Sequence, residues 1–429
     1  MKTIIKHVQY LDPDTGSEQQ GHLVMSDGHI SGFTGDVISD AHEVVEGDGR
    51  WVLPGFIDLH VHFREPGGET KETLESGARA AVAGGFTTVV CMPNTQPSLD
   101  HAEILRQQLA KAASLPCQIL FMGAVTRGLA GRERIDFKEY NFPGVVGVTD
   151  DGRPISEALL MMEALQEGKR YGLLVANHCE DESLMFDRSV NQGAVSEKLG
   201  LQGVPALAEE LMVQRDLYLA GATGCPVHLQ HISTAASVNL IRRAKAEGVP
   251  VTAEAAPHHF SLTEYAVMTR GAMAKMSPPL RRETDMRAVR AGLADGTLDC
   301  IATDHAPHEA AVKGEDLAKA ANGVVGLETA FGAAVTHLMD TGTLSLKQLV
   351  TCMSTRPAAM LGLSKKGNLK TGAEADVVLV DLRRRWTVDS STFASKSHNT
   401  PFQGMALRGQ VQGTWVRGKR VYENRVTVE

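Results

Sequence analysis

The 429-residue sequence lacks several features that mark common classes of protein. No run approaches 18 consecutive apolar residues, so we expect no membrane-spanning helix. No basic tract occurs, and 51 acidic residues against 43 Lys and Arg give a net charge of −8, so we expect no nucleic-acid partner. The six cysteines are scattered without a C-x-x-C pair, which predicts reduced thiols and a cytoplasmic location.

Apolar residues make up 43% of the chain, which is enough for a full hydrophobic core. Residues 1–53 and 366–429 are typical of short strands separated by turns, and neither piece has enough apolar residues for a core of its own. We therefore predict that both terminal pieces pair into one small β-sandwich domain.

The middle of the chain, residues 54–365, alternates short apolar runs with helix-like stretches. The runs are Gly55–His62, Phe86–Met92, Gln118–Ala124, Val145–Asp150, Gly172–His178, Pro226–His231, Pro250–Glu254 and Asp299–Asp304. Eight strands that alternate with helices predict an α/β fold, a (β/α)₈ TIM-like barrel. The alternative is a doubly wound open sheet, but its usual Gly-x-Gly-x-x-Gly turn is absent.

Residues that can bind a metal stand at the carboxyl ends of these runs, where such barrels carry their active sites. His60 and His62 project to the same side of one strand because side chains alternate with period two. A single buried His is more often a hydrogen-bonded core residue, but several at one rim indicate a metal site. The strand ends in question carry His60, His62, Asn94, Asp150, Asp151, His178, His231, Asp304 and His305.

Nitrogen and oxygen ligands without thiolates suit Zn²⁺, with Mn²⁺ or Co²⁺ as alternatives. Six ligands are too many for one open tetrahedral zinc, so we expect two ions with a bridging hydroxide as nucleophile. An anion must also bridge the two ions. Periodicity does not decide between Asp150 and Asp151, but Gly152 makes Asp151 the looser residue and the better candidate.

Seven segments together resemble the bacterial type I dihydroorotases of the amidohydrolase superfamily, and the resemblance runs nearly end to end. They are Asp58–Gly67, Met92–Thr95, Thr149–Gly152, Asn177–Asp181, His231–Thr234, Thr252–His259 and Ala302–His308. The resemblance implies that the metal pair is held by His60, His62, Asp151, His178, His231 and Asp304. It also implies that Asp151 takes the bridging role of a carbamylated lysine in most relatives, and no lysine stands in 145–151.

The implied reaction is the reversible cyclisation of N-carbamoyl-L-aspartate to L-dihydroorotate and water in pyrimidine (UMP) biosynthesis, with Asp304 as general acid and base. An anionic substrate needs a local positive site in this acidic protein. Arg64 starts on the same side of its strand as His62, and its planar fork suits a carboxylate. A surface salt bridge to Glu65 or Glu69 is the alternative for Arg64.

Further substrate contacts are implied by the resemblance at His62, Asn94, His308, Ser277, Asn322 and Gly323. Ser277 stands where the family commonly has Asn, and Ala321-Asn322-Gly323 stands where it commonly has Pro-Phe-Gly. Both departures concern the identity and affinity of the substrate and leave the metal ligands unchanged.

Two other functions stay open. One is a different cyclic-amide hydrolase, such as a hydantoinase or allantoinase, although Arg64 and Asn94 favour a substrate with a carboxylate. The other is a non-catalytic, dihydroorotase-like partner of aspartate transcarbamoylase, although such subunits lose ligands and none is lost here. A homodimer and an association with aspartate transcarbamoylase are implied by the family alone.

Overall fold

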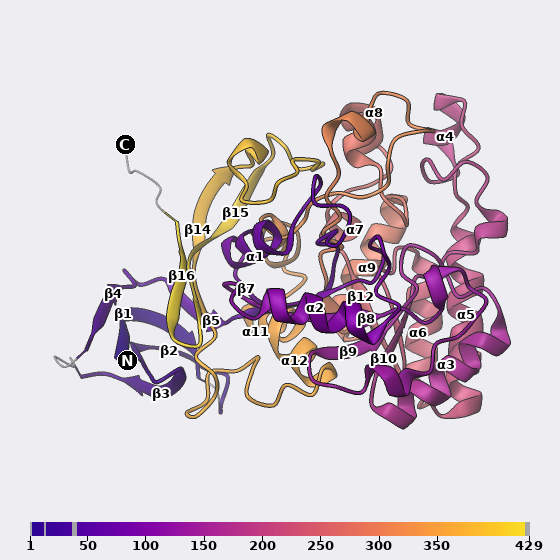
Figure 1. The fold of residues 1–429 in the computed structure, drawn as a ribbon. Helices are drawn as coiled ribbons and strands as arrows, with labels where there is room; N and C mark the ends of the chain where they lie inside the picture. The colour runs from indigo at the N-terminus through magenta and orange to yellow at the C-terminus, as the bar shows by residue number, and fades with distance from the viewer. Residues whose placement is uncertain (1, 13, 37–40, 425–429) are drawn as a thin grey trace.

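The computed structural model describes residues 2–12, 14–36 and 41–424, and within them the middle of the chain forms a barrel of parallel strands (Figure 1). The strands follow one another in chain order: β6 (Phe56–Val61), β7 (Phe86–Cys91), β8 (Gln118–Gly123), β9 (Val145–Val148), β10 (Leu174–Asn177), β11 (Val227–Leu229), β12 (Val251–Ala255) and β13 (Cys300–Ile301). The first and last strands meet through a parallel bridge between Val61 and His305, and the N–H of His62 donates to the carbonyl of His305 at 2.9 Å. The ring is therefore nearly closed, with the strand ends gathered at one rim.

Six longer helices lie outside the strands, each in the connection between two consecutive strands of the barrel. They are α1 (Leu74–Ala83), α2 (Ala102–Ala112), α3 (Ala158–Tyr171), α5 (Ala206–Thr223), α6 (Ala235–Ala246) and α9 (Glu283–Asp295). Helix α1 begins at Leu74 because Thr73 caps it, with its hydroxyl accepting from the N–H of Ser76. Helix α3 ends at Tyr171 because the next residue, Gly172, adopts the left-handed conformation with φ 67°.

Shorter helices fill the connections after several strands. They are α4 (Ala194–Leu199), α7 (Pro257–Ser261), α8 (Ala266–Arg270), α10 (Ala330–Ala334), α11 (Leu346–Val350) and α12 (Arg356–Met360). Two π-helical turns, at Val335–Met339 and Thr351–Thr355, continue α10 and α11. Among the described residues, no helix has the length and apolar character needed to cross a membrane.

Both ends of the chain contribute to a second sheet, which lies beside the barrel (Figure 1). Its strands are β1 (Lys2–Leu11), β2 (Glu18–Ser26), β3 (His29–Thr34), β4 (Glu43–Glu46), β5 (Trp51–Pro54), β14 (Val377–Thr387), β15 (Ala406–Val416) and β16 (Lys419–Glu423). Strand β5 joins the two halves because it pairs in parallel with β1 and antiparallel with β14. The predicted fold class, a (β/α)₈ barrel with a small β-domain built from both termini, is confirmed. A β-sandwich was predicted for that domain, and the described terminal strands form one eight-stranded sheet.

The terminal sheet has a small core of its own and also packs on the barrel. Ile5, Leu23, Val52 and Trp415 belong to that core and are at most 1% exposed. Val378, in contrast, belongs to the main hydrophobic cluster with the barrel helices. The domain bounds 1–53, 54–365 and 366–429 stay predictions, and residues 1, 13, 37–40 and 425–429 lie outside the described residues.

Candidate functional site

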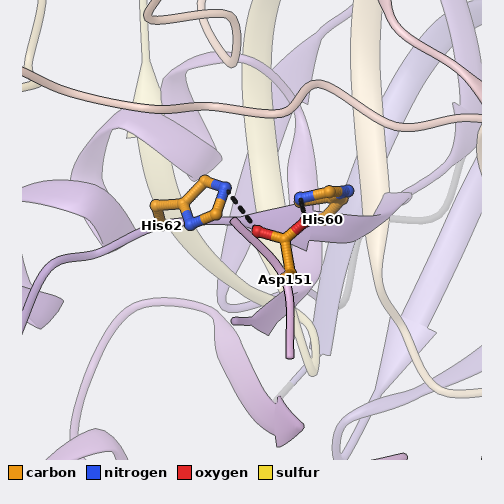
Figure 2. Close-up of side chains that lie close together, drawn as sticks. All are labelled: His60, His62 and Asp151. Carbon is orange, nitrogen blue, oxygen red and sulfur yellow. Dashed lines mark ion pairs between the residues drawn. The ribbon is translucent and has the colours of Figure 1, made fainter. Parts of the chain in front are cut away.

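Four histidines from three strands surround the carboxylate of Asp151 at the rim of the barrel. His60 Nε2, His178 Nδ1 and His231 Nε2 lie 3.4, 3.6 and 3.8 Å from Oδ1 of Asp151. His62 Nε2 lies 3.4 Å from the other oxygen, Oδ2. Figure 2 shows the Asp151 carboxylate between the rings of His60 and His62. His60 lies in β6 and His62 directly follows its last residue, and both rings face Asp151, so the period-two prediction of their common direction agrees with the structure.

Asp304 completes this group from the end of β13. Its Oδ1 atom lies 3.0 Å from Nε2 of His62 and 3.7 Å from Nε2 of His60. The structure therefore brings together all six residues predicted to bind metal. Asp150, the other candidate bridge, points away: its carboxylate accepts from the N–H groups of Val125 and Thr126.

Three of the imidazoles have a hydrogen-bond acceptor on the side away from Asp151. The pairs are His60 Nδ1 with Glu254 Oε1 at 2.7 Å, His62 Nδ1 with Asn94 Oδ1 at 2.8 Å, and His178 Nε2 with Glu180 Oε2 at 2.9 Å. An imidazole that donates its outer N–H keeps a lone pair on its inner nitrogen. This is the arrangement of metal-binding histidines, in which an outer acceptor fixes the tautomer and the ring orientation.

The inner atoms of this group need a cation. His60 Nε2 and Asp151 Oδ1 are both buried and have no hydrogen-bond partner among the described residues. Lone pairs and carboxylate oxygens that face one another at 3–4 Å repel unless positive charge lies between them. Two ligand groups share Asp151, namely His60, His62 and Asp151, and Asp151, His178 and His231. A donor set of imidazole and carboxylate fits a divalent metal ion.

The electrostatics of the cluster also favour positive charge. Burial would raise the pKa of Asp151, but the surrounding imidazoles, His60 first, hold it well below its usual range. Burial would likewise lower the pKa of His178, but hydrogen bonds to Asp151 and Glu180 raise it to about 10. Both shifts indicate that positive charge close to the buried carboxylates is favoured in spite of burial.

Three of the predicted site residues have a backbone conformation that L-residues rarely adopt. Arg64 has φ 60°, His231 has φ 32° and Asp304 has φ 47°. Such strain persists only where the surroundings enforce it, and it is common at active sites. Here it occurs where three strands end and their side chains must turn toward one centre.

A cavity of about 210 Å³ opens above the cluster. The residues predicted to contact substrate all line it, namely His62, Arg64, Asn94, Ser277, His308, Asn322 and Gly323. Two polar atoms at this end of the cavity, His308 Nδ1 and Asn322 Oδ1, are buried without a hydrogen-bond partner. They can therefore bind the polar groups of a ligand.

Arg64 supplies positive charge to this cavity. Burial lowers its pKa to about 10, so it stays protonated at neutral pH. Its Nε donates to the carbonyl of Pro307 at 3.2 Å, and Nη2 lies 3.3 Å from Nε2 of His308. The alternative ion pair with Glu65 or Glu69 does not form: the Glu65 carboxylate binds Lys111 and the N–H of Leu74, and that of Glu69 accepts from the N–H of Gly67. Burial and the charge of Arg64 lower the pKa of His308 to about 3, which keeps it neutral.

The two departures from the family pattern have different surroundings. Ser277 does line the cavity, but its hydroxyl donates to Oε2 of Glu180 at 2.5 Å. The carbonyl of Asn322 lies 2.7 Å from Nε2 of His308, while its side-chain oxygen is unpaired. Asn322 is therefore the more available of the two for a ligand.

Sequence reasoning missed two of the three acceptors behind the ligands, Glu254 and Glu180. Glu254 is the last residue but one of β12 and also pairs through Oε2 with Nε2 of His228 at 3.0 Å. Nδ1 of His228 lies 2.9 Å from Thr252 Oγ1. A lone acid at the end of a buried strand was the available signal for Glu254. Glu180, two residues after His178, offered no comparable signal.

Comparisons with known proteins agree with this arrangement. The family model described as "Amidohydrolase family" matches residues 51–421. The chain is 45% identical to a dihydroorotase of Pelotomaculum thermopropionicum and 44% identical to one of Ruminiclostridium cellulolyticum, over 99% of this chain and 100% of each relative. Among solved structures it resembles an L-hydantoinase (dihydropyrimidinase) from Arthrobacter aurescens, with a TM-score of 0.88, 26% identity and coverage of 100% of this chain and 97% of that one.

Proposed function

The chain belongs to the dihydroorotases of the amidohydrolase family, and from this premise we propose that it closes N-carbamoyl-L-aspartate to L-dihydroorotate and water, reversibly, in pyrimidine biosynthesis. The identity of 41–45% to eight dihydroorotases, over nearly the whole chain, is the observation that carries the activity. The substrate is a small molecule, and its negative charge matches Arg64, a buried basic side chain of the cavity lining. The lining also includes Arg188, which pairs with Glu182.

We assign the carboxylate end of the substrate to Arg64, with Asn94, His308 and the Asn322–Gly323 segment around it. The guanidinium provides two parallel N–H donors of fixed geometry, which suits a carboxylate. Neutral His308 and Asn322 add one unpaired polar atom each. Ser277, which binds Glu180, shapes the wall beside His178.

The cofactor is a divalent metal, and we propose two zinc ions per chain. His60, His62, Asp151, His178, His231 and Asp304 would hold them, with Asp151 shared because it belongs to both ligand groups. Divalent ions at such a site supply Lewis acidity to the amide carbonyl and to water.

Asp304 is proposed as the general acid and base. Burial raises its pKa, but the hydrogen bond from His62 and the other imidazoles outweigh burial and lower the pKa below its usual range. Ring opening needs the carboxylate form to accept a proton, and ring closure needs the carboxylic acid form to return one. The Oδ1 atom faces the cluster, where that proton is exchanged.

The two alternative functions have weaker support. The hydantoinase structures share the fold at 21–26% identity, well below the identity to the dihydroorotases. A scaffold subunit that had lost its chemistry would not keep all six predicted ligands together at one site. A cytoplasmic location, a homodimer and association with aspartate transcarbamoylase stay predictions.

Metal analysis combined with turnover of dihydroorotate, hydantoin and allantoin tests this proposal. We expect about two metal ions per chain and a preference for dihydroorotate. Preference for hydantoin would establish the other hydrolase instead, and protein with neither metal nor turnover would establish the scaffold.

A further inference from the structure

The buried side-chain amide of Asn399 connects the segment between the last strands of the chain to the end of the cavity assigned to the substrate carboxylate. Asn399 lies between β14 and β15 and is 2% exposed. Its Oδ1 accepts from the N–H of His308 at 3.1 Å, and its Nδ2 donates to the carbonyls of Ala306 at 3.1 Å and Gly323 at 3.0 Å. Its own carbonyl accepts from the N–H of Val325 at 2.9 Å. The carboxamide therefore uses its acceptor and both of its donors on the backbone of two loops.

The backbone held by Asn399 carries the groups assigned to the substrate carboxylate. Ala306 and His308 flank Pro307, whose carbonyl accepts from Nε of Arg64. Gly323 directly follows Asn322, whose side-chain oxygen is unpaired at the cavity. A shift of either loop would move Arg64, His308 and Asn322 relative to one another.

Lys313 holds the same loop at Gly323. Its Nζ donates to the carbonyls of Gly323 at 2.9 Å, Lys275 at 3.0 Å and Ala321 at 3.0 Å. The Gly323 carbonyl thus accepts from both Lys313 and Asn399, which occupies its two lone pairs. Gly323 has φ 125°, and a Cβ there would lie 2.7 Å from Cβ of Ala306, so the two loops are already in close contact.

The segment that carries Asn399 is itself anchored to the barrel. Ser395 Oγ donates to Glu72 Oε2 at 2.5 Å, and Ser397 Oγ donates to the carbonyl of Lys71 at 2.7 Å. Glu72 and Lys71 follow β6 in the same loop region as Arg64. These hydrogen bonds hold the segment of Asn399 against the barrel, so its amide links two parts of the protein that are each fixed in place.

We propose that Asn399 is a positioning residue for substrate binding, which aligns Arg64, His308 and Asn322 on the substrate carboxylate through the backbone at 306–308 and 323. This proposal rests on the proposed function for its substrate. An amide suits the task because one planar group must accept once and donate twice. Binding groups that are misplaced even slightly lose much of their contribution to substrate binding. We therefore expect the loss of Asn399 to lower substrate affinity.

Two substitutions and one control test this role. Asn399→Asp keeps the shape but turns a carboxylate oxygen toward the carbonyls of Ala306 and Gly323, and Asn399→Ser is the milder change should the first fail to fold. Thr400→Val is the matched control, because Thr400 is equally buried but its hydroxyl accepts from the N–H of Phe402, two residues further along the same segment. We expect both Asn399 variants to raise KM for dihydroorotate by about tenfold or more with kcat within about threefold, bound metal unchanged, and Thr400→Val to resemble wild type.

A double-mutant cycle separates positioning from a general loss of stability. If Asn399 acts through His308, Asn399→Ser raises KM less in a His308→Ala background than in wild type. Equal effects in both backgrounds, or a fall in kcat at constant KM, would overturn the proposal.

Amide hydrogen exchange across residues 306–325 needs no substrate and keeps this proposal distinct from the proposed function. Faster exchange there in Asn399→Ser, but not in Thr400→Val, supports the positioning role. Unchanged exchange overturns it even if wild type turns dihydroorotate over. Absence of turnover in wild type would instead refute the proposed function, and the exchange data alone would then decide whether Asn399 holds the loops.

Discussion

The carboxylate of Glu254 lies 2.7 Å from Nδ1 of His60 and also accepts from the backbone N–H of His231 at 3.2 Å. One buried acid therefore orients two predicted metal ligands that come from strands on different parts of the barrel. Burial raises the pKa of Glu254, but the neighbouring His60 and His228 outweigh it and lower the pKa below its usual range. Glu254 stays ionised and fixes the inner lone pair of His60.

Replacing Glu254 tests this arrangement. Glu254→Gln removes the charged acceptor, so His60 is no longer held in one tautomer, and we expect metal affinity to fall by about 10- to 100-fold. Competition with a chromophoric chelator measures the change. Glu264→Gln makes the same substitution at a buried acid whose side chain binds Asn191, and should leave metal affinity unchanged. Equal affinity in Glu254→Gln and wild type would contradict the role.

Arg64 should contribute to substrate affinity and not to metal binding. Arg64→Ala removes the guanidinium from the cavity, and we expect substrate binding to weaken by about 1.5–3 kcal/mol, roughly ten- to a hundredfold, with metal content unchanged. Arg64→Lys keeps a charge without the planar fork and should recover only part of the loss. KM values and metal analysis of the three proteins check this, and loss of metal from Arg64→Ala would refute the assignment.

The sequence allowed prediction of the barrel and of its metal ligands because both follow from local patterns. Apolar runs mark the strands, and period two places His60 and His62 on one side. The apolar pattern predicts strand length less well where the strand depends on its neighbours. The predicted run 299–304 forms a strand, β13, only at Cys300–Ile301, and the ring closes through a bridge at His305. Glu254 and Asn399 could not be assigned roles, because their partners lie tens to hundreds of residues away and no periodicity links them.

Glu328 should give the stability of the protein a measurable pH dependence. Its carboxylate accepts from the N–H groups of Ala394 and Ser395, but burial and then nearby Glu72 raise its pKa from 4.5 to about 7. The folded state therefore binds more protons than the unfolded state between these values. The resulting stabilisation is full below pH 4.5 and is lost as pH rises to about 7.

Glu328→Gln cannot titrate and isolates that contribution. We expect the free energy of unfolding of wild type, relative to Glu328→Gln, to decrease steadily between pH 4.5 and 7. Urea unfolding of both proteins across this range, followed by circular dichroism, provides the comparison. A difference that stays constant with pH would mean that Glu328 has the same proton affinity in the folded and unfolded states.

Asp304 should give the two directions of the reaction opposite responses to pH. Its lowered pKa makes the carboxylate the dominant form above pH 5, which is the form that accepts a proton in ring opening. Ring closure uses the scarce protonated form, so its rate should fall as pH rises, while the rate of opening should not. Initial rates in both directions from about pH 5 to 10 test this, with Asp304→Asn expected to lower kcat by about 10²- to 10⁴-fold in each direction. The same pH trend in both directions, or turnover by Asp304→Asn close to wild type, would exclude Asp304 as the proton carrier.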